Sequence, residues 1–351
     1  MNDTILNIRQ KQILELINKG GGISRLEVVE TLPKQYRASV PTISRDLNLL
    51  LKSKLVAVSG KGPNTKYFPI DNNLLLRYVD IEEYFLIDPD KRENINTKFN
   101  NKIFGDLSCI FSALEIRDIN KENKSFSERS KSLSKDIYLK ELERFVIEFS
   151  WKSSKIEGNT YSLLDTEALI KQKMEALGHS KEEAVMILNH KSAFETIMEN
   201  IKDFRKISFS QITQLHNILV KDLNVETGIR SQAVGITGTK YVPLDNKWQI
   251  KEAIETLIAT INKSKYPLEK ALLAITMISY IQPFADGNKR TARMLANAIL
   301  VAHDFYPLSY RSVDESYYKK ALIIFYEQNS LYPLKEIIKD QYLFAINTYF
   351  K

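Results

Sequence analysis

Residues 271–293 constrain the possible folds of this chain more than any other stretch. The segment ALLAITMISYI (271–281) is too apolar for a surface helix and predicts a helix buried in a core. Pro283 ends that helix, and the following run, QPFADGNKRTAR (282–293), predicts a tight turn that enters a second helix. A buried helix, a turn and a returning helix are typical of a mainly α protein.

The turn brings together groups that bind phosphate. Gly287 and Asn288 permit a tight turn with outward-facing backbone N–H groups, and a helix from Lys289 would direct its positive end to the same place. Arg290 and Arg293 lie three residues apart, on one face of that helix. The alternative is that both arginines are ordinary solvated helix charges.

Three more positions complete the predicted loop. Phe284 is an apolar anchor that would pin the loop to the core. Asp286 places a carboxylate at the rim, where one oxygen could hold Mg²⁺. Gln282 stands where a catalytic base would be expected, and its amide cannot take up a proton near pH 7. The set therefore predicts a di- or triphosphate site with a metal, and leaves proton transfer in question.

The run QPFADGNKRTAR resembles the Fic family motif, H-P-F-x-D/E-G-N-G/K-R-x-x-R. Fic proteins transfer a nucleotide monophosphate, usually AMP from ATP, onto a hydroxyl group of a target protein. The resemblance implies ATP and Mg²⁺ as cofactors, an all-helical Fic fold, and a nucleotide site at Phe284, Gly287, Asn288, Lys289, Arg290 and Arg293.

Two positions depart from the common form of the motif. Lys289 replaces a second glycine, a variant that also occurs in the Doc toxins, which phosphorylate their targets. Gln282 replaces the histidine that accepts the proton of the attacking hydroxyl in active members. General base catalysis contributes about 10²–10⁴-fold, so we expect slow transfer or none.

A second resemblance covers the family's flap, a hairpin that clamps the target segment. Gly228-Ile229-Arg230 precedes SQAVGITGTKYVPLD (231–245), in which apolar residues alternate around a Thr-Gly-Thr turn. An extended peptide would pair with such a flap through its main chain. The residues expected to dock the target are Val234, Gly235, Ile236, Thr237, Gly238 and Tyr241.

The string SSKIEGN (153–159) is similar to the family's inhibitory motif, S/T-x-x-x-E-G/N, at the end of a predicted helix spanning about 136–158. The resemblance implies that Ser153, Glu157 and Gly158 form a brake in which Glu157 binds Arg293. A carboxylate in that position occupies the charge that a γ-phosphate requires. The alternative for Glu157 alone is an exposed acid at a helix end.

The first seventy residues carry most of the excess positive charge. They contain 11 lysines and arginines against 5 acidic residues, and the whole chain has a net charge of +7. A local basic patch is what nucleic-acid binding requires. Ser24-Arg25-Leu26-Glu27 has the form of a capping box, and Ser39 can cap a further helix, VPTISRDLNLLLKSK.

In that further helix, Val40, Ile43, Leu47 and Leu50 form the expected buried stripe. A predicted hairpin, LVAVSGKGPNTKYFPI, follows it. With a first helix predicted at Arg9 to Asn18, the segment has three helices and a hairpin. This order resembles a winged helix-turn-helix of the DeoR-like type, which implies duplex DNA as a partner. The expected DNA-binding residues are Thr42, Ser44, Arg45 and Asn48 on the helix and Lys61 in the wing. Such domains also serve as protein-docking or dimerisation modules.

These patterns predict a domain at 1–70, a connector at 71–106 and a Fic domain at 107–351, with the catalytic loop at 282–293. Polar residues 118–136 predict an exposed loop. No apolar run reaches the roughly 18 residues that span a bilayer. The single Cys109 and the polar N-terminus favour a cytoplasmic protein without membrane contact, and the scattered histidines form no metal cluster.

Two functions fit this sequence. One is an autoinhibited protein adenylyltransferase that modifies an unknown target protein or itself, and possesses an impaired base position. The other is a nucleotide-sensing, DNA-binding transcriptional regulator without transferase activity. AMP removal or phosphorylation by the same scaffold is a weaker alternative, and both predicted domain types often form homodimers.

Overall fold

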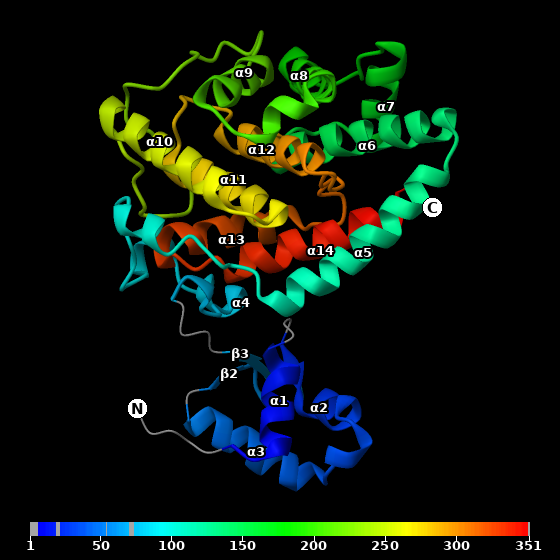
Figure 1. Cartoon of the computed structure of the whole chain (residues 1–351). Coiled ribbons are helices and arrows are strands. Elements are labelled where there is room, and N and C mark those ends of the chain that lie inside the picture. The colour runs from blue at the N-terminus through cyan, green and yellow to red at the C-terminus, as the bar shows by residue number, and fades with distance from the viewer. Residues whose placement is uncertain (1–5, 19–21, 54, 70–73, 350–351) are drawn as a thin grey trace. The chain divides into compact units, whose positions relative to one another are not determined.

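The computed structural model describes residues 6–18, 22–53, 55–69 and 74–349, and all structural statements concern these residues. They divide into a smaller unit, residues 1–86 with 330–336, and a larger unit, residues 87–329 with 337–351. The division falls inside the predicted connector, whereas the predicted boundary at residues 70 and 71 lies outside the described residues. The fold is mainly α, as predicted (Figure 1).

The smaller unit contains the helices and the hairpin expected from its sequence. Its helices are α1 (Ile8–Asn18), α2 (Arg25–Thr31), α3 (Val40–Lys52) and α4 (Ile81–Tyr84). Its strands β1 (Ile23–Ser24), β2 (Val56–Ser59) and β3 (Lys66–Pro69) form an antiparallel sheet in the order β1-β3-β2. The predicted capping box is present, since Ser24 and Glu27 cap each other's backbone N–H groups.

Helix α3 differs in two details from its prediction. Ser39 occupies the N-cap position, but its hydroxyl pairs with the Thr42 hydroxyl at 3.0 Å and makes no cap to the backbone. Val40 is half-buried, and Asp46 joins the buried face instead. The Asp46 carboxylate accepts hydrogen bonds from Arg9 Nε at 2.7 Å and Gln10 Nε2 at 2.8 Å. A buried charge is tolerated there because both donors come from α1 and satisfy it.

The larger unit is a helical assembly around α11 (Pro267–Ile281) and α12 (Asn288–Ala302). Every α11 residue after Pro267 is buried, which confirms the prediction of a core helix. Helix α12 packs against α11, α9, α8 and α6, and α13 packs against α11 (Figure 1). The remaining helices are α5 (Ala113–Ser132), α6 (Lys135–Ile156), α7 (Leu163–Gln172), α8 (Lys181–Glu199), α9 (Phe209–Leu219), α10 (Lys247–Lys263), α13 (Glu315–Gln328) and α14 (Tyr332–Thr348), of which residues 332–336 belong to the smaller unit.

The prediction of an exposed loop at 118–136 is wrong. The segment lies mostly in α5, whose N-terminus has a capping box made by Ser112 and Glu115. Ile119 and Phe126, seven residues apart, provide the buried contacts, and most of the polar residues between them are exposed. Two buried positions in twenty residues are too few to reveal the helix from sequence periodicity.

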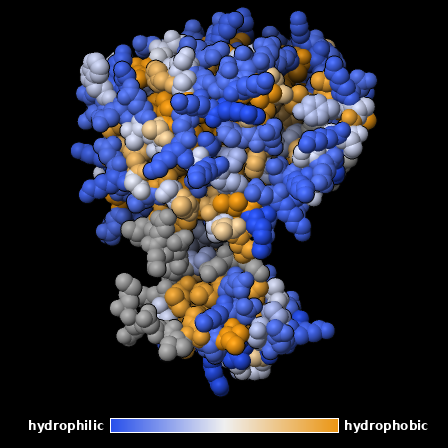
Figure 2. Space-filling model, viewed as in Figure 1, coloured by the Kyte–Doolittle hydropathy of each residue, from blue (hydrophilic) through white to orange (hydrophobic). Residues whose placement is uncertain are grey.

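The face of the larger unit that is visible in Figure 2 is mostly polar. Figure 2 shows hydrophilic side chains over most of its visible face, with small apolar patches between them. None of the described helices has an apolar stretch of the length that a bilayer requires.

The Asp46 contacts generate a stability prediction. Asp46→Ala leaves the Arg9 guanidinium and the Gln10 amide without their acceptor, so we expect the smaller unit to lose about 1–3 kcal/mol. Hydrogen exchange of the whole chain should become faster in α1 and α3 and stay unchanged in α11 and α12. Asn48→Ala, which removes an exposed side chain of the same helix, is the control. Equal exchange in the Asp46→Ala and Asn48→Ala proteins would contradict the account.

Candidate functional site

The loop between α11 and α12 is closed by its own side chains. Asn288 Oδ1 accepts a hydrogen bond from Phe284 N at 2.9 Å, and Asn288 Nδ2 donates to Phe284 O at 2.8 Å. Gly287, with φ 78°, is the N-cap of α12, and a Cβ atom there would lie 2.8 Å from Val220 Cγ1. Helix α12 therefore begins at Asn288, one residue earlier than predicted. The Asn288 side chain holds the turn, so backbone N–H groups and the helix end are what the loop can offer a ligand.

Phe284 anchors the loop as predicted. The ring is fully buried and stacks on His216 with centroids 3.7 Å apart. His216 Nε2 donates to Asp286 O at 2.9 Å, because a carbonyl oxygen can only accept. Burial lowers the pKa of His216, so its ring is neutral near pH 7. Through its stacking on Phe284 and its hydrogen bond to the Asp286 carbonyl, this histidine supports the loop.

Arg290 is buried, with 3% of its side chain exposed, and is not a solvated helix charge. Its Nη2 lies 3.1 Å from Asp286 Oδ2, and its Nη1 donates to Leu219 O at 3.3 Å. Asp286 itself is 69% exposed at the rim. A rim carboxylate fits an Mg²⁺ ion whose other ligands are phosphate and water oxygens, and does not fit an all-protein metal site. Among the described residues, no three or more His, Cys, Asp or Glu side chains are grouped so that they could hold a metal ion.

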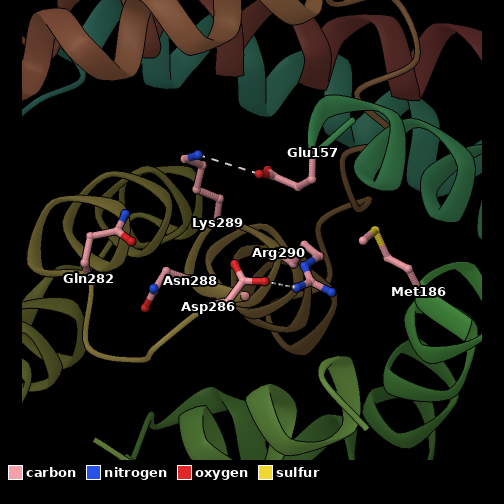
Figure 3. A pocket seen from close by; sticks show the side chains of 8 residues that line it. Glu157, Met186, Gln282, Asp286, Asn288, Lys289 and Arg290 are labelled. Atoms are coloured by element: carbon pink, nitrogen blue, oxygen red, sulfur yellow. Dashed lines mark hydrogen bonds and ion pairs between the residues drawn. The ribbon is translucent and has the colours of Figure 1, made fainter. Parts of the chain in front are cut away.

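The loop forms one wall of a small polar pocket of about 130 Å³ (Figure 3). Figure 3 shows Glu157 reaching toward Lys289 from the opposite wall, with the Arg290–Asp286 pair beside them. Predicted nucleotide-site and inhibitory residues therefore meet in one place. The lining residues are Glu157, Met186, Gln282, Asp286, Gly287, Asn288, Lys289 and Arg290.

Arg293 and Glu157 form the ion pair expected from the resemblance. Arg293 Nη1 lies 2.8 Å from Glu157 Oε1, and Lys289 Nζ lies 3.6 Å from Glu157 Oε2. Arg293 is fully buried, whereas 18% of the Glu157 side chain is exposed. Burial opposes ionisation of Glu157, but the charges of Arg293, Lys289 and Arg290 outweigh it and hold its pKa below the usual value.

Ser153 binds the same arginine twice. Arg293 Nε donates to Ser153 Oγ at 2.9 Å, and Arg293 Nη2 donates to Ser153 O at 2.8 Å. Helix α6 ends at Ile156, so the Ser153 carbonyl belongs to the last turn and has no partner farther along the helix. The guanidinium satisfies that carbonyl and interacts favourably with the negative end of the helix. Ser153 and Glu157, four residues apart, thus face the same arginine, and Gly158, with φ 100°, turns the chain away.

Gln282 ends α11 in a left-handed conformation with φ 50°. Its Nε2 donates to Ser279 O at 2.7 Å, and 8% of the residue is exposed. Because the amide nitrogen is used in this way, Oε1 is the atom that can accept a hydrogen bond from a molecule in the cleft. The amide can orient a hydroxyl group, but it cannot remove its proton.

The predicted flap lines a larger cleft of about 820 Å³. The segment turns at Thr237 and Gly238 as predicted, and Val242 forms a parallel bridge with Lys98. The flap residues that line the cleft, opposite α13, are Val234, Gly235, Ile236 and Thr237.

Two predicted docking residues do not line this cleft. Tyr241 is 1% exposed, and its hydroxyl donates to Tyr280 O at 2.8 Å, so it anchors the flap to α11. Gly238 O accepts a hydrogen bond from Arg92 Nη1 at 3.1 Å. The alternation that suggested a target-facing Tyr241 instead places an aromatic ring in the core.

Arg230 is a site residue to which we assigned no role from sequence. It is 4% exposed, and its backbone N–H donates to Pro283 O at 3.0 Å. Its guanidinium donates to Gln282 O at 2.6 Å, to Gln232 O at 2.6 Å and to Leu244 O. Arg230 therefore joins the catalytic loop to both ends of the flap. In the sequence, only its position directly before the flap indicated a role for Arg230. The groups that accept its hydrogen bonds are backbone carbonyls, which a sequence motif does not reveal.

The predicted DNA-binding residues lie on α3 and between β2 and β3 of the smaller unit. Arg45, Asn48 and Lys61 are exposed. Thr42 and Ser44 are half-buried, and Ser44 Oγ donates to Val40 O at 2.9 Å. Arg45 and Asn48 on α3, and Lys61 between β2 and β3, are therefore accessible to a binding partner.

Comparison with known proteins connects this geometry to a family. A family model described as Fic/DOC family matches residues 206–300, which include α9, α10, α11 and most of α12. The protein adenylyltransferase Fic of Nematostella vectensis is 30% identical over 176 residues, which cover 49% of this chain and 41% of that protein. The protein adenylyltransferase fic-1 of Caenorhabditis elegans is 28% identical over 159 residues, 44% of this chain and 31% of that protein. The chain therefore spans less than half the length of these relatives.

Solved structures share the fold. Fic-1 from C. elegans superposes with a TM-score of 0.59 and 21% identity, over 66% of this chain and 70% of that one. A Fic domain containing signaling protein from Bacteroides thetaiotaomicron gives a TM-score of 0.57 and 22% identity, over 66% and 94%. Residues 206–300 therefore match a Fic/DOC family domain, and the solved structures show that the fold is shared.

Proposed function

We propose that the larger unit is an autoinhibited, Fic-type protein adenylyltransferase whose transfer step is impaired at Gln282. The observation that carries the proposal is the buried pairing of Arg293 with Glu157 beside a pocket lined by Lys289, Arg290 and the end of α12. A buried cation beside backbone N–H groups and two further cations suits a polyphosphate. The names of the relatives, protein adenylyltransferases, supply the reaction.

In this proposal, Glu157 competes with the terminal phosphate of ATP for Arg293. The loop backbone, Lys289 and Arg290 bind the other phosphates, and Asp286 would hold Mg²⁺, which supplies charge neutralisation when bound. A hydroxyl of a target protein or of the chain itself, oriented by Gln282 Oε1, attacks the α-phosphorus, pyrophosphate leaves, and the hydroxyl proton passes to water. Without a base at residue 282, positioning and electrostatics alone accelerate the step.

The flap provides the proposed docking surface for the target segment. Val234, Gly235 and Ile236 line the cleft on the side opposite α13. An extended segment of the target could pair with this backbone, which would place its hydroxyl near Gln282. Main-chain pairing by itself discriminates little between sequences.

A second candidate is a nucleotide-sensing, DNA-binding regulator without transferase activity. Two observations favour it: Gln282 lacks a titratable group, and the smaller unit combines α1–α3 with an antiparallel sheet in a basic segment. Here, exchange of Glu157 for ATP at Arg293 is the signal, and the smaller unit is a winged helix-turn-helix that docks α3 in the major groove.

The two candidates differ in their response to two substitutions. Glu157→Gly removes the competitor, so we expect tighter ATP binding but slow AMP transfer or none. Adding Gln282→His restores a base, so the transferase proposal expects AMP addition about 10²–10⁴-fold faster, read by intact mass with ATP and Mg²⁺. Glu199→Gly, which removes an exposed acid at the end of α8, should change neither.

Each possible result of this experiment supports or excludes a particular candidate function. Failure of the Glu157→Gly protein to bind ATP would overturn both candidates. ATP binding without AMP addition, even with Gln282→His, would leave only the sensor. Rapid AMP addition with Gln282 in place would show that transfer here needs no histidine.

The brake should also appear in the pH dependence of stability. The pKa of Glu157 is lowered by folding, so its stabilising contribution is complete above the unfolded value of 4.5 and is lost as pH falls through the folded value. We expect Glu157→Gln to cost about 1–3 kcal/mol at pH 7, because Arg293 keeps its burial and loses its counter-charge. The difference between the two proteins in chemical denaturation should persist to about pH 5 and shrink below the reference carboxyl pKa. A difference that grows with acidification would contradict the ion pair.

The DNA proposal has its own test. Arg45→Ala with Lys61→Ala should weaken binding to duplex DNA and reduce the slope of log affinity against log salt by about 0.9 per lost phosphate contact. Lys202→Ala with Lys206→Ala removes equal charge from exposed positions of the larger unit and is the control. Equal losses in both variants would indicate non-specific electrostatics, and unchanged affinity would exclude groove docking by α3.

A further inference from the structure

A buried histidine, His190, contacts Ser153, which is also a partner of Arg293. His190, in α8, is fully buried and does not line the phosphate pocket. Its Nε2 lies 2.9 Å from Ser153 Oγ, and its Nδ1 lies 2.8 Å from Met186 O. Ser153 makes two hydrogen bonds with Arg293, so His190 is linked to the arginine through Ser153.

The acceptor at Nδ1 determines where the protons lie. A carbonyl oxygen can only accept, so Nδ1 carries the hydrogen of the neutral ring and Nε2 is a bare acceptor. Burial lowers the pKa of His190 to about 3, which keeps the ring neutral at physiological pH. The Ser153 hydroxyl must then donate to Nε2, and its oxygen accepts the N–H of Arg293 Nε. The donors run in one direction, from Arg293 to Ser153 and from Ser153 to His190.

This order fixes two of the three nitrogens of the Arg293 guanidinium. Nε is bound to Ser153 Oγ and Nη2 to Ser153 O, whereas Nη1 is paired with Glu157. A guanidinium is planar, so fixing two nitrogens fixes the direction of the third. The group that an incoming phosphate would meet is therefore already oriented, and replacing Glu157 does not require the arginine to turn.

We propose that His190 is a positioning residue for nucleotide binding, which orients Arg293 for a terminal phosphate by accepting the hydrogen of the Ser153 hydroxyl. This inference rests on the proposed function, in which Arg293 contacts the terminal phosphate of ATP and not the phosphate nearest the nucleoside. Without the acceptor, the Ser153 hydroxyl is free to rotate, and the Arg293 side chain loses part of its preorganisation.

A purely structural role is the competing explanation. The His190 ring also packs edge-on against Phe149, with centroids 5.9 Å apart, so its removal disturbs the interface between α6 and α8. Such a disturbance would affect all nucleotides alike. A loss of orientation at Arg293 would affect ATP but not AMP, which has no terminal phosphate to reach it. The ratio of ATP to AMP affinity therefore separates the two roles.

The experiment measures ATP and AMP affinity by calorimetry in the 351-residue chain that carries Glu157→Gly. We expect His190→Phe to weaken ATP binding about fivefold, the equivalent of one net hydrogen bond, and to leave AMP binding unchanged. His190→Gln restores an acceptor and should recover most of the ratio. Phe194→Leu, which alters a buried residue of the same helix that contacts Phe149, is the stability control and should not change the ratio.

A second variant keeps the test decisive if His190→Phe fails to fold. Ser153→Ala should lower the ratio of ATP to AMP affinity, and adding His190→Gln to it should have no further effect, because the hydroxyl that needs an acceptor is gone. Equal losses for ATP and AMP, or no change, would overturn the positioning role. Failure of the Glu157→Gly protein to bind either nucleotide would instead overturn the proposed function.

Discussion

A fully buried guanidinium at Arg293 is the constraint on which the site depends. Burying a charge without partners is prohibitively costly, so the surrounding structure must supply acceptors wherever this side chain lies. It does so from one short segment, the last turn of α6 and its C-cap residue, which provides the Ser153 hydroxyl, the Ser153 carbonyl and the Glu157 carboxylate. Helix α6 and helix α12 are thus joined by charge as well as by packing, and any ligand that uses Arg293 must first compete with this segment.

Other contacts hold the loop in place. A phosphate that replaced Glu157 would therefore change the partner of Arg293 without changing the shape of the loop. Asn288 holds the turn through the Phe284 backbone, and His216 binds the carbonyl of the loop residue before Gly287. Arg230 connects the loop to the flap. Each of these groups satisfies backbone atoms that would otherwise lack partners in a dry interior. Glu157 and Lys289, at the edge of the pocket, retain some exposure to solvent. Glu157 and Lys289, the charged groups that a ligand would meet first, therefore lie at the edge of the site, and the buried hydrogen bonds of the loop do not depend on them.

The local parts of this arrangement could be predicted from sequence, and the long-range parts could not. Spacing within residues 282–293 places Arg290 and Arg293 on one helix face, whereas the contact between residues 153–158 and Arg293 was expected only because both strings resemble family motifs. His190 was not recognised, because a lone histidine in a helix gives no sign of a partner 37 residues away. Tyr241 was assigned to the surface because alternation in a short segment does not say which side is buried. The helix at 113–132 was missed because only two of its positions reach the core.

The central claim is that Glu157 and the terminal phosphate of ATP compete for the same guanidinium. A double-mutant cycle on ATP affinity measures this directly, with Glu157→Gly, Arg293→Gln and the combination of both. We expect Glu157→Gly to increase ATP affinity in the presence of Arg293 and to have no effect on it once Arg293 is replaced by glutamine. An equal gain from Glu157→Gly in both backgrounds would show that Glu157 opposes ATP by some route other than Arg293, and would contradict the account.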